Sequence, residues 1–177
     1  MRREEIVQWL GGLVPAELEF REDSAAADLG DDQRMALTVG FSDVDTGLVA
    51  VDGGADVRSE LIAVARVEKE QLRTVVEAAA RMLADAAGLL PAQPGTMLPN
   101  LAERAGLQDV TVAHGLFVPP YLWGGETPRV TEEDRLTVVL QLVMLTDAEY
   151  AYAVEEGPGG LQQALGEAGI DLLDWRR

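Results

Sequence analysis

The stretch LTVVLQLVML, residues 136–145, decides how the rest of the chain is arranged. It is almost entirely apolar and rich in β-branched residues, as is typical of an interior strand that is covered on both faces. The four residues that follow, Thr146-Asp-Ala-Glu149, match a capping box, in which two side chains satisfy free amides at a helix start. These two signals predict a central strand followed at once by a helix that begins at Asp147.

Turn-forming residues on either side of this stretch show where the neighbouring elements stop. Gly157-Pro-Gly-Gly160 ends the predicted helix, and residues 161–168 supply one more short helix. Upstream, apolar residues alternate over 110–118 until Pro119 and Pro120 interrupt the pattern. We therefore expect another strand over 110–118.

Apolar spacing predicts three further elements. Apolar residues recur at three and four positions over 3–13 and, in alanine-rich sequence, over 72–86, where Gly88 offers a cap. Residues 58–67 have the length and the alternation of a strand. The first two segments are predicted as helices and the third as a strand.

The N-terminal third is expected to contain short strands and acidic turns. Seven acids lie in residues 17–32, which we interpret as a strand running into an exposed acidic loop. The apolar stretches 35–41 and 48–51 flank the turn formers 42–47 and should pair as a hairpin. Residues 90–100 carry three prolines and are expected to form an irregular surface connection.

The order of these elements fits a single domain, residues 1–177, of the α+β class. A mainly antiparallel or mixed sheet covered by helices explains the order better than a regular strand–helix alternation. With 177 residues, of which 47% are hydrophobic and 25% charged, the chain is long enough to bury a substantial core.

The chain is strongly acidic, with 31 Asp and Glu against 14 Lys and Arg and a formal net charge of −17. Nucleic acid and anionic lipid are bound by clustered basic side chains, so we expect neither nucleic acid nor a membrane as partner. No stretch has the pattern of a secretory signal or a membrane span, which predicts a cytoplasmic protein. The absence of cysteine excludes disulfides and thiolate chemistry.

No residue pattern predicts a catalytic, cofactor or metal site. His114 is the only histidine, and its place in an apolar strand favours a hydrogen-bonded structural role. The aspartates within 43–56 lie near glycines but lack the spacing of a calcium loop, and the glycine-rich segments lack a phosphate-loop pattern. We expect no cofactor, no metal and no enzymatic activity.

Two groups of side chains are candidates for binding a protein partner. Phe117, Tyr121 and Trp123 lie around two prolines, and aromatic side chains stiffened by proline are suitable anchors. We expect Tyr121 and Trp123 to be partly exposed, with packing into the core as the alternative. Arg58 and Glu60 share one face of a strand, where they form either a structural ion pair or part of a binding surface.

The acids of residues 17–32 and 132–134 have two interpretations. They are either a solvated surface or a negative face that speeds association with a basic protein.

Several segments, taken in order, resemble the suppressor-of-fused family. They are Arg58-Ser-Glu-Leu61 with the helix after it, Pro94-Gly95, Gly115-Leu-Phe-Val-Pro-Pro120, Leu140 to Glu149, and Asp174 to Arg177. The resemblance covers residues 58–177 and lies in order and spacing, whereas residues 1–57 show no clear family pattern. It implies a mixed α/β domain that binds proteins, since animal members hold transcription factors of Hedgehog signalling in the cytoplasm. The length resembles that of compact bacterial relatives, which are often uncharacterised or are viewed as immunity proteins that neutralise toxins.

Three functions therefore stay open. The first is a non-catalytic protein-binding domain, in its most specific form an immunity protein that binds a basic toxin. The second is a hydrolase-like enzyme in which Glu60 or Asp56 works with His114. The third is a structural homo-oligomer that uses an apolar edge. A pocket joining His114 to a carboxylate would favour the enzyme, and an exposed Trp123 on an acidic face would favour binding.

Overall fold

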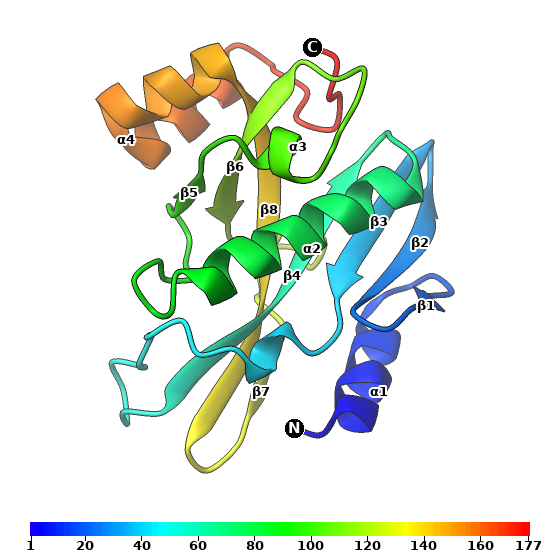
Figure 1. Ribbon diagram of the computed structural model, residues 1–177, viewed down its shortest axis with the longest axis vertical. Helices are drawn as coiled ribbons and strands as arrows, with labels where there is room; N and C mark the ends of the chain where they lie inside the picture. The colour runs from blue at the N-terminus through cyan, green and yellow to red at the C-terminus, as the bar shows by residue number, and fades with distance from the viewer.

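A computed structural model, which describes all 177 residues, shows a mixed sheet of eight strands with helices on both faces (Figure 1). The elements in chain order are α1 Arg3–Leu13, β1 Glu19–Phe20, β2 Ser24–Gly30, β3 Gln33–Thr38, the 3-10 turn η1 Phe41–Asp43, β4 Asp56–Ala65, α2 Lys69–Asp85, β5 Met97–Leu98, α3 Leu101–Arg104, β6 Val112–Val118, β7 Arg129–Thr131, β8 Arg135–Thr146 and α4 Asp147–Glu167. The strand order is β1-β2-β3-β4-β8-β6-β5, and β7 pairs with β8 outside this path. The predicted α+β class is confirmed.

β4 and β8 form the interior of the sheet. They run parallel, with Asp56 opposite Arg135 and Ala63 opposite Leu142, and all other strand pairs are antiparallel. Both strands are buried along most of their length. This confirms the strand predicted over 58–67 and the interior strand predicted over 136–145, because a strand that is apolar on both sides needs cover on both faces.

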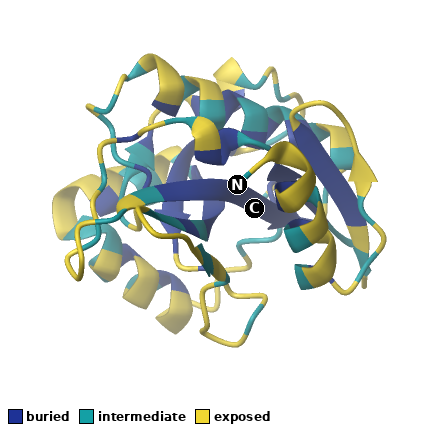
Figure 2. Ribbon diagram, turned by 90° about the horizontal axis from the view of Figure 1, so that it is seen from below, coloured by how far each residue is buried: buried dark blue, intermediate teal, exposed yellow.

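Helices cover the two faces unequally. α2 and α3 pack on one face through a core of 22 buried residues. On the other face, α1 covers the side formed by β2 to β4, and α4 covers the side formed by β6 and β8. Figure 2 shows the strands dark blue inside the molecule and the outward sides of the helices yellow. Between α1 and α4, the middle of this second face is left to irregular segments.

The predicted helices are confirmed. α1 and α2 cover the predicted ranges, and α4 begins with the expected capping box. The Glu149 N–H donates to Thr146 Oγ1 at 3.3 Å, and the Thr146 N–H donates to Glu149 Oε2 at 2.9 Å. Gly157 has non-helical backbone angles, φ 83° and ψ 159°, so α4 consists of two helical segments that meet before Pro158. None of the helices is long and apolar enough to cross a bilayer.

Two predictions in the N-terminal third are wrong. Residues 17–32 do not form one strand that runs into a loop. They form the two strands β1 and β2, and the buried alanines of β2 pair with β3. The stretches 35–41 and 48–51 are not a hairpin, because β3 pairs with β2 and β4 and the later stretch makes one isolated bridge, Val49 to Asp56. The acids of 17–32 are exposed as expected. Residues 90–100 are irregular apart from β5.

Candidate protein-binding surface

Residues 119–124 leave the end of β6 and cross the sheet face between α1 and α4. Two hydrogen bonds fix this segment. The Tyr121 N–H donates to Gln141 Oε1 of β8 at 2.8 Å, and the Trp123 indole N–H donates to Leu13 O at the end of α1 at 3.1 Å. The Trp123 ring is half-buried and packs against the core beneath α1. The segment is therefore fixed against the sheet and α1.

The Tyr121 side chain stands between two depressions. Tyr121 is 55% exposed, and burial of the remainder raises the pKa of its hydroxyl. One depression, of about 250 Å³, is lined by Leu122 and Leu172, and the other, of about 260 Å³, by Leu165 and Ile170. Tyr121 and Leu172 line both. We call these five residues, with the two depressions, the Tyr121 surface.

Exposed acids lie beside this apolar surface. Asp31 and Asp32 directly precede Gln33, which lines the first depression. Glu167 is the last residue of α4 and directly follows Gly166, which lines the second depression. None of these three acids takes part in an ion pair, so their charges stay uncompensated. The surface combines an apolar floor with a negative rim.

The predicted partial exposure of Tyr121 and Trp123 is confirmed, but the other three candidates are buried. Phe117 is fully buried in the core beneath α2. Arg58 is also buried, and its Nη2 pairs with Asp56 at 3.0 Å and Asp45 at 3.4 Å. Because a buried side chain cannot touch a docking partner, the proposed binding roles of Phe117, Arg58 and Glu60 are corrected to structural ones.

Glu60 is the centre of a buried polar cluster. Its carboxylate accepts hydrogen bonds from the N–H groups of Gly40, Phe41 and Ser42 at 3.0, 3.3 and 3.1 Å. The Thr38 and Ser42 hydroxyls add bonds of 2.5 and 2.8 Å. Burial raises the pKa of the Glu60 carboxyl, and these donors oppose the rise. Glu60 thus holds the chain in place where β3 enters η1.

His114 has a buried structural position. Its Nδ1 accepts the Asn100 N–H at 3.0 Å, so Nε2 carries the ring proton and donates it to Asp147 Oδ1 at 2.8 Å. The ring stacks on Tyr150, with 4.1 Å between the ring centroids. Both ring nitrogens are engaged, and the histidine connects β6, the start of α3 and the start of α4.

The carboxylates that the enzyme hypothesis placed beside His114 lie elsewhere. Glu60 bonds to the backbone around η1, and Asp56 pairs with Arg58. His114 lines neither the two depressions of the Tyr121 surface nor three other clefts of the molecule. The structure also has no group of three or more His, Asp or Glu side chains placed to share a metal ion. The hydrogen-bonded structural role predicted for His114 is the one its geometry supports.

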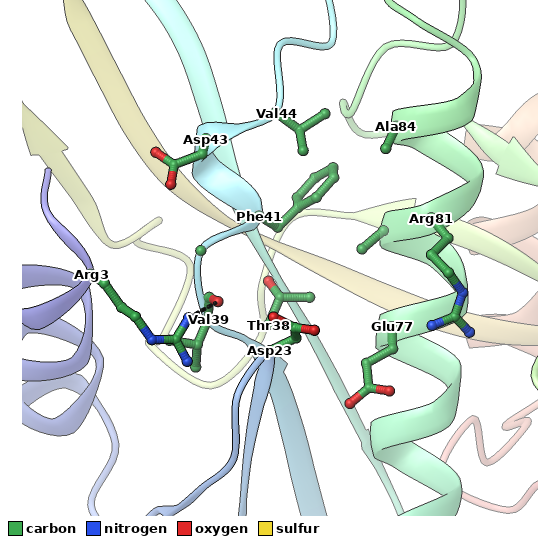
Figure 3. A pocket seen from close by; sticks show the side chains of 12 residues that line it. Arg3, Asp23, Thr38, Val39, Phe41, Asp43, Val44, Glu77, Arg81 and Ala84 are labelled. Carbon is green, nitrogen blue, oxygen red and sulfur yellow. Dashed lines mark hydrogen bonds between the residues drawn. The ribbon is translucent and has the colours of Figure 1, made fainter.

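A second, charged cleft was not foreseen from the sequence. It has a volume of about 450 Å³ and is lined by Arg3 of α1, Phe41 of η1 and Arg81 of α2, among others (Figure 3). These residues are far apart in the chain, and no motif connects them.

The arrangement of strands and helices is that of solved suppressor-of-fused structures. A SUFU homolog from Neisseria gonorrhoeae superposes with a TM-score of 0.70 and 15% identity, over 99% of this chain and 94% of that chain. A chain of the Sufu–Fu complex gives 0.62 and 12%, over 96% and 84%. Drosophila Suppressor of Fused gives 0.52 and 14%, and the chain spans 42% of that protein's length. At these identities the likeness shows a shared fold.

The fold thus defines a domain of the suppressor-of-fused type. The family model described as Suppressor of fused protein (SUFU) matches residues 27–177, and the chain belongs to this family. The match begins in β2, so it extends well before residue 58, where the resemblance read from the sequence began. No curated protein matches the chain by sequence.

Proposed function

We propose that this chain is a non-catalytic protein-binding domain that engages its partner through the Tyr121 surface. The observation that carries the proposal is Tyr121, a large aromatic side chain half exposed between two apolar depressions on a fixed segment. Rigidly presented aromatic side chains lose little conformational freedom on binding and are frequent hot spots. The crystal structure of the Sufu–Fu complex contains a chain of the same fold, which supports a protein partner.

The partner best suited to this surface has apolar side chains on a basic surface. Apolar groups fill the depressions, and the uncompensated acids Asp31, Asp32 and Glu167 attract positive charge at the rim. The net charge of −17 acts in the same direction at longer range. In its most specific form, the proposal is that the protein is an immunity protein that covers the working surface of a basic toxin.

Co-expression with a toxin encoded beside this protein tests the proposed function. The unaltered protein is expected to bind the toxin and restore growth, and the double variant Tyr121→Ser with Leu122→Ser is expected to fail. Tyr152→Ser is the matched control, because Tyr152 is 42% exposed on α4 and lines neither depression. If the double variant restored growth as well as the unaltered protein, the Tyr121 surface would not be the binding site. If the unaltered protein formed no complex with the toxin, the immunity role would be wrong.

A homo-oligomer formed through an apolar sheet edge stays a prediction. The strands that end the sheet, β1 and β5, are two residues long, so they offer few backbone groups for pairing with a second copy.

A further inference from the structure

The charged cleft that contains Arg3 and Arg81 shares no residue with the Tyr121 surface. It opens between the first turn of α1, the end of β3 with η1, and the second half of α2. Figure 3 shows Arg3 and Arg81 on opposite sides of the cleft, with Phe41 between them. Its volume of about 450 Å³ is enough for a small organic molecule or a terminal residue of a peptide.

The floor of the cleft is held rigidly from below. Glu60 binds the N–H groups of Gly40, Phe41 and Ser42, and this fixes the turn that carries the Phe41 ring. Gly40 has a φ of +100°, and a Cβ there would lie 3.6 Å from Arg3 Nη1. The guanidinium of Arg3 therefore lies close over this part of the floor.

Two guanidinium groups face the cleft without a carboxylate partner. Arg3 donates to the backbone oxygens of Val39 and Arg21, both at 3.2 Å, which fixes the group but leaves its charge uncompensated. Arg81 is exposed and forms neither a hydrogen bond nor an ion pair. Eight of the 14 basic side chains do pair with carboxylates. In so acidic a chain, two unpaired arginines at one cleft indicate a place for an anion.

The acids of the cleft limit which anion fits. Glu77 accepts the Ser24 hydroxyl at 2.7 Å, and Asp43 lies 3.8 Å from Arg135, so both are partly engaged. Asp23 has no side-chain partner. Three carboxylates in the lining repel a group with two negative charges, such as phosphate, more strongly than a group with one. A single carboxylate also matches the fork of a guanidinium group.

We propose that this cleft binds a monocarboxylate attached to an apolar group, carried either by a small free acid or by the C-terminal residue of a peptide. Arg81 holds the carboxylate, and the fixed Arg3 adds a second positive charge. Phe41 and Val44 contact the apolar part.

Titration with N-acetyl-leucine, followed by amide chemical shifts, tests this proposal. N-acetyl-leucine is expected to bind, and its uncharged analogue N-acetyl-leucinamide and inorganic phosphate are expected to bind about tenfold more weakly or not at all. Arg81→Gln is expected to weaken N-acetyl-leucine binding by about tenfold. Arg104→Gln is the control, because Arg104 is an exposed, unpaired arginine outside the cleft and its loss should change nothing.

Two further ligands distinguish the sources of the carboxylate. Tighter binding of acetyl-Ala-Ala-Leu with a free C-terminus points to a peptide end, and tighter binding of 4-methylpentanoate points to a small free acid. The Tyr121→Ser, Leu122→Ser variant should bind all these probes normally, so failure here is separate from failure of the proposed function.

Three results would overturn the proposal. The first is equal binding of N-acetyl-leucine and its amide. The second is full affinity in Arg81→Gln with an unchanged melting temperature. The third is absence of binding both in the unaltered protein and in Glu77→Gln, because Glu77 lies one helical turn from Arg81 and is the internal carboxylate that could compete for it.

Discussion

The Glu149 side chain joins the start of α4 to the C-terminal residue. Glu149 Oε2 lies 2.6 Å from Arg177 Nη2, and the same carboxylate accepts the Thr146 N–H. Burial alone would raise the pKa of Glu149, but the bonds from Arg177 and Thr146 outweigh it and lower the pKa below the ordinary value of 4.5. Glu149→Gln is therefore expected to lower the free energy of unfolding at pH 7 by about 1–3 kcal/mol.

The pH dependence of this loss follows from the direction of the shift. Because the folded-state pKa is the lower one, the stabilisation by Glu149 is complete above 4.5 and is lost as the pH falls through the folded-state value. Urea unfolding should show a large difference between Glu149→Gln and the unaltered protein at pH 7 and a smaller one at pH 3. Glu155→Gln, an exposed change on the same helix, should show little difference at either pH. A difference that is the same at both pH values would contradict this account of Glu149.

For single residues, the sequence indicated which side chains were suitable for binding, but it predicted only in part which of them are buried. Tyr121 and Trp123 follow two prolines that end a strand, which is a local signal of exposure. Phe117 is still inside β6, so it is buried. Arg58 and Glu60 interrupt an apolar strand. Asp56 lies two residues from Arg58 on the same strand, but their other partners come from residues 38–45, which precede β4 and bend back over it. No local pattern gives such a contact.

Gly115 allows β6, α3 and β8 to approach closely. A Cβ at Gly115 would lie 2.8 Å from Leu101 Cδ2 and 2.9 Å from Leu142 Cδ1. Gly115→Ala is expected to lower the free energy of unfolding by about 1–3 kcal/mol through overpacking. Gly11→Ala is a control with the opposite expected sign. A Cβ at Gly11 on α1 meets nothing within 4 Å, so this change should raise the free energy of unfolding by about 0.5–1 kcal/mol. Chemical denaturation measures both, and a stabilised Gly115→Ala variant would show that the contact can relax freely.

Helices and interior strands were predictable because their signals are local. Apolar spacing, a capping box and a Gly-Pro break determine α1, α2, β8 and α4. The pairing of β2 with β3 was missed for two reasons. Ala25 to Ala27 are all buried and show no alternation, and the turn uses Asp31 and Asp32 at φ of 51° and 59°, a conformation more typical of glycine. The three-residue β7 is too short to give a pattern.

The net charge of the whole molecule predicts how a partner associates. If a basic protein binds the Tyr121 surface, its association rate constant should fall by about tenfold or more as salt is raised from low to high concentration. The dissociation rate constant should change much less. Asp31→Asn with Asp32→Asn should reduce the salt dependence, as measured by stopped-flow fluorescence. An association rate constant that does not vary with salt would show that the acids are only a solvated surface.

The family and the fold class were accessible from the sequence of the whole molecule, but the sheet order and the Tyr121 surface were not. The surface is assembled from residues 119–124, the end of α4, the tail after it and the centre of the sheet. Its depressions exist because α1 and α4 cover only the two sides of one face. That spacing depends on the order of strands in space, which one sequence does not specify.

Binding of a protein partner at the Tyr121 surface is tested most directly by amide hydrogen exchange of the complex. Exchange over residues 121–124 and 170–173 is expected to slow when the partner binds, while the first half of α4, residues 147–156, exchanges as in the free protein. Unchanged exchange over 121–124 and 170–173, with protection at another part of the molecule, would contradict the proposal.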